Sequence, residues 1–184
     1  MEDIKERLGE YKYNFFKNLQ NYLETELMFF GSVKRLDYFN NSSDYDIVVI
    51  TDNVSNTLMR VKNYLHIDKN DVKKVYQNFR EISPNLVIGH KIKYDDDKNN
   101  LSFDILIYDE KYRDIILKEM DDSNNMPFYM ITILYILKCI YYNLGLMNSS
   151  YYIYIKRIIF SMYQNKKIII SEKDTARNIV LDKF

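Results

Sequence analysis

The segment Phe29-Phe30-Gly31-Ser32, followed by Asp44-Tyr45-Asp46 at the start of Ile47-Val48-Val49-Ile50, decides the fold of this chain. Its first part predicts a short apolar strand that ends at a tight Gly-Ser turn. Its second part predicts another strand, which begins with two carboxylates. Side chains alternate between the two faces of a strand, so Asp44 and Asp46 point the same way. Together they can chelate a divalent metal ion.

A third carboxylate lies among apolar residues further along the chain. Asp104 stands in the run 101–107, which predicts another strand. An ionised carboxylate in apolar surroundings is costly unless it is paired or bound to a metal. If this strand lies beside the one with Asp44 and Asp46, three carboxylates form one site. Hard oxygen ligands of this kind suit Mg²⁺ or Mn²⁺.

The Gly-Ser turn suits a phosphate group. Gly31 lets the backbone come close to a ligand, and backbone N–H groups with the Ser32 hydroxyl can donate to phosphate oxygens. Lys34 and Arg35 follow directly and can offer positive charge to a triphosphate. As loop residues they are equally compatible with two solvated side chains.

The rest of the chain supplies helices and strands around these segments. We expect helices at 2–26, 57–65 (capped by Asn53 or Ser55), 72–79, 111–120, 128–144 and 151–163, strands at 27–30, 45–51, 86–94, 101–108 and 167–170, and a short terminal helix. The sequence therefore predicts an α+β fold, with a mixed β-sheet flanked by helices in residues 1–109. A mostly helical region, 110–184, follows and packs on this core.

Composition limits the class of protein. The 184 residues are 47% hydrophobic with a formal net charge of zero, which fits a compact domain and disfavours a generic nucleic-acid coat. Cys139 is the only cysteine, so neither a disulfide framework nor a cysteine-based zinc site is expected. The N-terminal residues lack the apolar core of a signal peptide. The apolar stretch 126–147 is interrupted by Lys138 and Asn143, which favours a buried helix over a membrane span. We expect a cytoplasmic protein without a membrane partner.

The order of these parts carries a resemblance to a known family. Gly31-Ser32, the pair Asp44 and Asp46, and Asp104 on a later strand resemble the signature of the DNA polymerase β-like nucleotidyltransferase superfamily. The resemblance covers residues 27–108 and implies a nucleotidyltransferase-like catalytic core in 1–109. It also implies that the three carboxylates hold two Mg²⁺ (or Mn²⁺) ions, that Asp104 helps to activate the acceptor hydroxyl, and that the Gly-Ser turn holds the triphosphate.

Two departures disfavour one branch of this superfamily. Residues 31–35 resemble the Gly-Ser-x-Arg-Arg form of family X polymerases, with Lys34 in one basic position. However, Leu36 stands where a second glycine is often found, and the loop to Asp44 is longer. The resemblance is therefore to the superfamily and not to family X.

The expected reaction moves a nucleoside monophosphate from an NTP to a hydroxyl acceptor and releases pyrophosphate. The favoured acceptor is a polynucleotide 3′ end of DNA or RNA, although the neutral net charge argues against tight duplex binding. One alternative is a protein or small-molecule acceptor, as in small bacterial nucleotidyltransferases that act as antitoxins. Another is a non-catalytic interaction subunit that keeps the scaffold. The base preference and the oligomeric state are left open by the sequence.

Overall fold

The computed structural model describes residues 2–40, 42–68, 71–78, 86–163 and 169–171. Its strands are β1 (Met28–Phe30), β2 (Tyr45–Thr51), β3 (Val72–Asn78), β4 (Leu86–Asp96), β5 (Leu101–Asp109) and β6 (Ile169–Ser171). Its α-helices are α1 (Lys5–Leu23), α2 (Val54–Leu65), α3 (Arg113–Asn124), α4 (Phe128–Lys138) and α5 (Ser149–Tyr163). Four short helical turns are η1 (Glu2–Ile4), η2 (Gly31–Lys34), η4 (Glu110–Tyr112) and the π-helical η5 (Cys139–Asn143).

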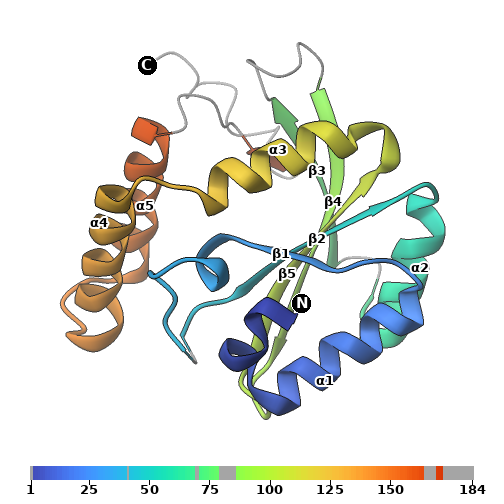
Figure 1. Cartoon of the computed structure of the whole chain (residues 1–184), viewed down its shortest axis with the longest axis horizontal. Helices are drawn as coiled ribbons and strands as arrows, with labels where there is room; N and C mark the ends of the chain where they lie inside the picture. Colours follow the sequence, from blue (N-terminus) through green and yellow to red (C-terminus); the bar gives the residue numbers. More distant parts are fainter. Residues whose placement is uncertain (1, 41, 69–70, 79–85, 164–168, 172–184) are drawn as a thin grey trace.

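The strands form one mixed sheet with helices on both faces (Figure 1). Their order is β1-β2-β5-β4-β3-β6, with β2 and β5 parallel and the other neighbours antiparallel. The helices α1 and α2 cover one face, whereas α3 lies across the other. The predicted α+β architecture is confirmed.

The central position of β2 follows from its sequence. Apart from Asp46, every residue of this strand is buried, as expected of an apolar run that is covered on both faces. The residues of β2 that face α1 and α2 belong to one hydrophobic cluster, and those that face α3 belong to another. The first cluster includes Phe16, Leu19, Val61, Ile47 and Ile105. The second includes Val48, Ile50, Tyr108, Ile116 and Met120.

Most elements lie where the sequence placed them, and β2 has its predicted bounds. The helix α2 begins after Asn53, whose side chain accepts a hydrogen bond from the Asn56 N–H at 3.0 Å. Asn53 is therefore the N-cap, and not Ser55. The helix α1 is interrupted at Gly9, where φ is +70°, although a continuous helix was expected. The predicted strand 167–170 lies partly outside the described residues. The predicted terminal helix lies entirely outside them.

One prediction is wrong. A helix was expected at 72–79, but the structure has the strand β3, which pairs along its whole length with β4. The lysines and Gln77 of this segment are compatible with a helix, yet Val72, Val75 and Tyr76 favour a strand. Pairing with β4 and burial of Val75 decide between them. Tertiary contacts override the local propensity here.

The helical region has a small core of its own. Residues of α4, α5 and the segment before α4 form a separate hydrophobic cluster that includes Met126, Leu134, Leu137, Tyr152 and Ile159. The opposite side of α4 is exposed, so the helix predicted to be buried is buried on one side only. No helix in the described part of the chain is long and apolar enough to cross a membrane. The division at residue 109 stays a prediction.

Candidate active site

The predicted site begins with two neighbouring carboxylates. The strands β2 and β5 are parallel neighbours, and Asp46 is paired in register with Asp104. The two side chains therefore stand side by side on the face of the sheet that α3 covers. Asp44 directly precedes β2 and is exposed, two residues before Asp46. The structure thus brings Asp46 and Asp104 together and places Asp44 at the mouth of the same strand.

The Gly-Ser turn lies against this carboxylate pair. Phe30, the last residue of β1, is the register partner of Asp46. Gly31 follows with φ of +74°, a conformation that residues with a side chain rarely adopt. A Cβ atom on Gly31 would lie only 2.7 Å from Asp46 Oδ2. Glycine is required at this position both by its backbone conformation and by the closeness of the carboxylate.

The charge of Asp46 is unfavourable in its surroundings. Burial, together with the negative charges of Asp104 and Asp44, raises the pKa of Asp46 to about 6. The positive charges of Lys156 on α5 and Lys91 on β4 oppose this rise. The three carboxylates therefore act on one another electrostatically. A bound cation would relieve the repulsion among them.

The two carboxylate oxygens of Asp104 have different surroundings. Its Oδ2 forms an ion pair with Lys91, whose Nζ is 2.5 Å away. Its Oδ1 is buried and has no hydrogen-bond partner among the described residues. A buried carboxylate oxygen without a donor is costly, so this atom has a binding capacity that the described side chains do not use. Such an atom fits a metal ligand.

The donor set fits a divalent ion only in part. Carboxylate oxygens are the ligands that Mg²⁺ and Mn²⁺ prefer, and the unpartnered Oδ1 of Asp104 supplies one of them. However, among the described residues no three Asp, Glu, His or Cys side chains are already arranged to hold a metal ion. Asp44, Asp46 and Asp104 share one region, but they do not converge on a single point.

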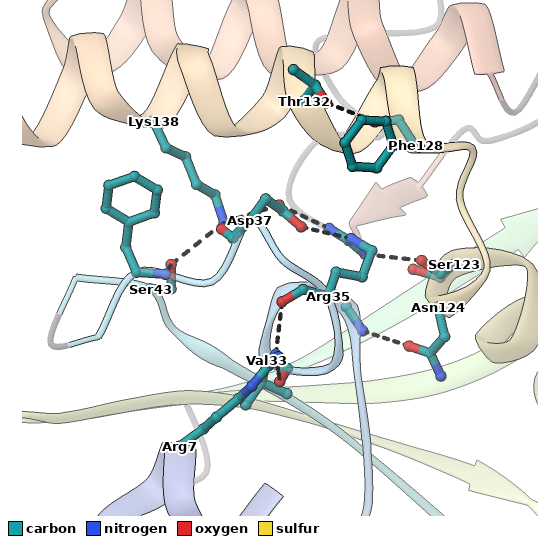
Figure 2. Close-up of polar contacts among 12 residues, drawn as sticks. Arg7, Val33, Arg35, Asp37, Ser43, Ser123, Asn124, Phe128, Thr132 and Lys138 are labelled. Carbon is teal, nitrogen blue, oxygen red and sulfur yellow. Dashed lines mark hydrogen bonds and ion pairs between the residues drawn. The ribbon is translucent and has the colours of Figure 1, made fainter.

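The turn itself is held from both sides (Figure 2). From α1, Arg7 Nη1 donates to the carbonyl oxygens of Val33 and Arg35 at 2.6 and 2.7 Å. From the end of α3, Asn124 Oδ1 accepts a hydrogen bond from the Gly31 N–H at 3.1 Å. Ser32 is buried within the turn. These contacts hold the backbone of the turn in place. The sequence predicts that this backbone binds a phosphate group.

The two basic residues after the turn differ in their surroundings. Lys34 is on the surface, where it forms an ion pair with Asp3 at 2.7 Å and lines a cavity of about 240 Å³. Arg35 is buried, and its guanidinium donates to both oxygens of Asp37 and to the Ser123 carbonyl (Figure 2). The donors of the Arg35 side chain therefore bond to residues inside the protein. Contact between the Arg35 side chain and a triphosphate stays a prediction. None of these hydrogen bonds supports it.

Asp37 joins the turn region to the helical region. Lys138 of α4 donates to the Asp37 carbonyl at 2.6 Å and lies 3.2 Å from its Oδ2 (Figure 2). Burial alone would raise the pKa of Asp37, but the hydrogen bond from Arg35 and the charge of Lys138 lower it overall. Burial lowers the pKa of Lys138, against the effect of Asp37. One buried carboxylate therefore pairs with two buried cations.

Three residues near the site were not identified from the sequence: Lys91, Asn124 and Lys156. Lys91 could have been found, because the hairpin tip at 95–100 fixes the register of the two strands. That register places Lys93 opposite Asp104 and Lys91 opposite Leu106, so both lysines share the face of Asp104. Asn124 and Lys156 come from helices far along the chain. Lys156 and Arg157 form a basic pair in the sequence, but no local pattern places either Asn124 or Lys156 beside the carboxylates.

Comparison with known proteins agrees with this geometry. The family model described as "Nucleotidyltransferase domain" matches residues 13–175, which is most of the chain. The match includes the turn, all three carboxylates and the strands that carry them. Neither the curated proteins nor the solved structures give a significant match.

Proposed function

Because this chain belongs to the nucleotidyltransferase domain family, we propose that it moves a nucleoside monophosphate from an NTP to a hydroxyl acceptor, using Mg²⁺ or Mn²⁺. The observation that carries this proposal is the position of Gly31 against Asp46, which is itself paired in register with Asp104. A phosphate-binding turn and a carboxylate pair within contact distance are the parts that phosphoryl transfer needs.

Asp44, Asp46 and Asp104 would hold the metal. When bound, the divalent ions would neutralise the phosphate charges and polarise the acceptor hydroxyl. In the reaction, the acceptor oxygen bonds to the α-phosphorus, the bond from that phosphorus to the bridging oxygen breaks, and pyrophosphate leaves. Asp104 orients the acceptor hydroxyl and helps to remove its proton.

Gly31 and Ser32 would hold the β- and γ-phosphates. The Gly31 N–H is hydrogen-bonded to Asn124 in the structure, so a phosphate oxygen must replace Asn124 there or use other donors of the turn. Lys34 is the basic residue of the turn nearest to solvent, and we expect its charge to attract the triphosphate. Arg35 contributes by fixing the shape of the turn through its bonds to Asp37 and Ser123.

For the acceptor, we favour a polynucleotide 3′ end. Lys73 is paired in register with Lys91 and therefore shares its face of the sheet, and Lys93 lies two residues further on the same face. These lysines extend from Asp104 across β4 to β3. A row of positive charge beside the site would attract a polyanion, even though the net charge of the chain is zero.

The test is to incubate the protein with each α-labelled NTP and Mg²⁺ in the presence of DNA, RNA or protein acceptors. We expect label in a polynucleotide, and loss of labelling in EDTA or in the variant with both Asp44→Ala and Asp46→Ala. Asp97→Ala, at the exposed hairpin tip, is the matched control and should keep full activity. Circular dichroism checks that each variant is folded.

Each other outcome has a definite meaning. Label in a co-purifying protein, insensitive to salt, would replace the polynucleotide by a protein acceptor. Labelling that survives the loss of Asp44 and Asp46 would overturn the assigned site. No labelling, together with no thermal stabilisation by any NTP and Mg²⁺, would favour a non-catalytic subunit.

A further inference from the structure

Lys91 contacts one of the carboxylates of the candidate site. It lies on β4, and its Nζ is 2.5 Å from Asp104 Oδ2, the carboxylate beside Asp46. The lysine side chain is 38% exposed, whereas that of Asp104 is only 16% exposed. The ammonium group therefore approaches Asp104 from the solvent side. It has room to leave without disturbing the core.

The contact leaves half of the carboxylate without a partner. Lys91 pairs with Oδ2, while no residue in the described part of the chain donates a hydrogen bond to the buried Oδ1. A purely structural ion pair is stable when its remaining oxygen is also satisfied, and here it is not. Asp104 therefore holds one cation and has the capacity for another ligand.

We propose that Lys91 is a built-in substitute for the divalent ion at Asp104, so that the metal and the Lys91 ammonium group compete for the same carboxylate. Both are hard, compact cations, and two of them on one carboxylate repel each other strongly. Metal binding then requires the flexible lysine side chain to move away. This proposal rests on the proposed function, because it concerns the same metal.

The register of the two carboxylates supports the competition. Asp46 and Asp104 are register partners, so their negative charges would repel each other without a nearby cation. The lysine thus stabilises the protein before the metal binds and sets how tightly the metal is held.

The neighbouring lysine provides a matched control. Lys93 lies on the same strand and the same face, two residues from Lys91. Its Nζ is 3.1 Å from Asp95, an exposed carboxylate, and forms its ion pair there, although Lys93 lies opposite Asp104 in the strand register. Removing Lys93 therefore takes the same charge from the same strand but leaves the contact between Lys91 and Asp104 in place.

The experiment is a Mn²⁺ titration followed by electron paramagnetic resonance, with no nucleotide present. We expect Lys91→Met to bind Mn²⁺ roughly two- to fivefold more tightly than the unmodified protein, which is the upper part of the range for a lost competing ion pair. Lys91→Arg should bind less tightly than Lys91→Met, because it keeps a cation. Lys93→Met should stay within twofold of the unmodified protein, on the order of the error of such differences.

A second measurement uses the unmodified protein and does not depend on how the variants fold. Amine acetylation, read by mass spectrometry of peptides, reports how accessible each lysine is. Adding Mg²⁺ should increase the labelling of Lys91 and leave that of Lys93 unchanged.

The outcomes separate the two proposals. Mn²⁺ binding that is equal or weaker in Lys91→Met, or labelling of Lys91 that does not change with Mg²⁺, overturns the role of Lys91 and leaves the proposed function standing. If neither the unmodified protein nor Lys91→Met binds Mn²⁺, the metal-dependent function is overturned and this proposal with it.

Discussion

The backbone of Gly31 lies so close to the Asp46 carboxylate that a single methyl group on the glycine would reach 2.7 Å from Oδ2. The same glycine has a φ of +74°. A side chain at this position would therefore be unfavourable for two separate reasons: its backbone would be strained, and it would collide with the Asp46 carboxylate.

Gly31→Ala should lower the free energy of unfolding by about 2–4 kcal/mol, because backbone strain and the clash with Asp46 add. The control is Gly145→Ala, where φ is +60° but a Cβ would meet nothing within 4 Å. That change should cost only the strain, about 1–2 kcal/mol. Urea unfolding measures both, and equal losses would contradict the importance of the contact with Asp46.

Asp46→Asn should stabilise the protein at neutral pH when no metal is present. Because the pKa of Asp46 is raised to about 6, its favourable contribution is complete below about pH 4 and is lost as the pH rises through 6. An asparagine avoids this loss, which we expect to be about 1–3 kcal/mol at pH 8. Urea unfolding in EDTA at pH 4 and pH 8 tests the difference.

Asp95 provides a control for the direction in which the stability changes with pH. The hydrogen bond from Ser102 lowers the pKa of Asp95, with a further contribution from Lys93. Asp95 therefore stabilises the protein above about pH 4, and Asp95→Asn should destabilise it at pH 8. The prediction for Asp46 is wrong if both variants shift the stability in the same direction.

Asp37→Asn should be among the most destabilising polar changes. It removes the negative charge with which both Arg35 and Lys138 pair, and the side chains of these two residues are only 4% and 5% exposed. A buried cation without its partner costs about 3–5 kcal/mol. Asp3→Asn breaks an exposed ion pair with Lys34 and should cost about 1 kcal/mol or less. Comparable losses in thermal or urea unfolding would show that the buried network contributes little.

Asn124→Ala should remove the acceptor of the Gly31 N–H and cost about 1 kcal/mol. If a phosphate oxygen can take the same donor, inorganic triphosphate with Mg²⁺ should restore more stability to this variant than to the unmodified protein. Asn125→Ala, which loses an exposed bond to Asp121, is the control and should show no such gain. Thermal unfolding with and without triphosphate decides between them.

Local patterns predicted the parts of the site that lie within single strands. The period of two along a strand predicted that Asp44 and Asp46 share a face, and the apolar run 101–107 predicted the strand that carries Asp104. The parallel pairing of β2 with β5, which sets Asp46 beside Asp104, joins segments far apart in the chain and follows from no local pattern. The strand β3 was missed because its lysines and Gln77 are compatible with either structure, and only pairing with β4 settles the matter.

The partners of Arg35 could not be predicted from the sequence for a different reason. The sequence suggested a solvated or phosphate-binding residue, since Arg35 follows a turn and no pattern marks it as buried. Its burial depends on Ser123 and on Lys138, which neutralises the same Asp37. These residues are about a hundred positions away along the chain, and such contacts cannot be derived from local spacing.

The link between Asp37 and Lys138 spans 101 positions, and this separation has a consequence for the order of synthesis. The chain is made from its N-terminus, so the glycine turn leaves the ribosome long before Lys138 does. Until α3 has been made, Arg35 lacks the Ser123 carbonyl, and until α4 has been made, Asp37 lacks one of its two cationic partners. The turn can reach its final shape only late in translation, and a nascent chain that ends before residue 138 is expected to be inactive.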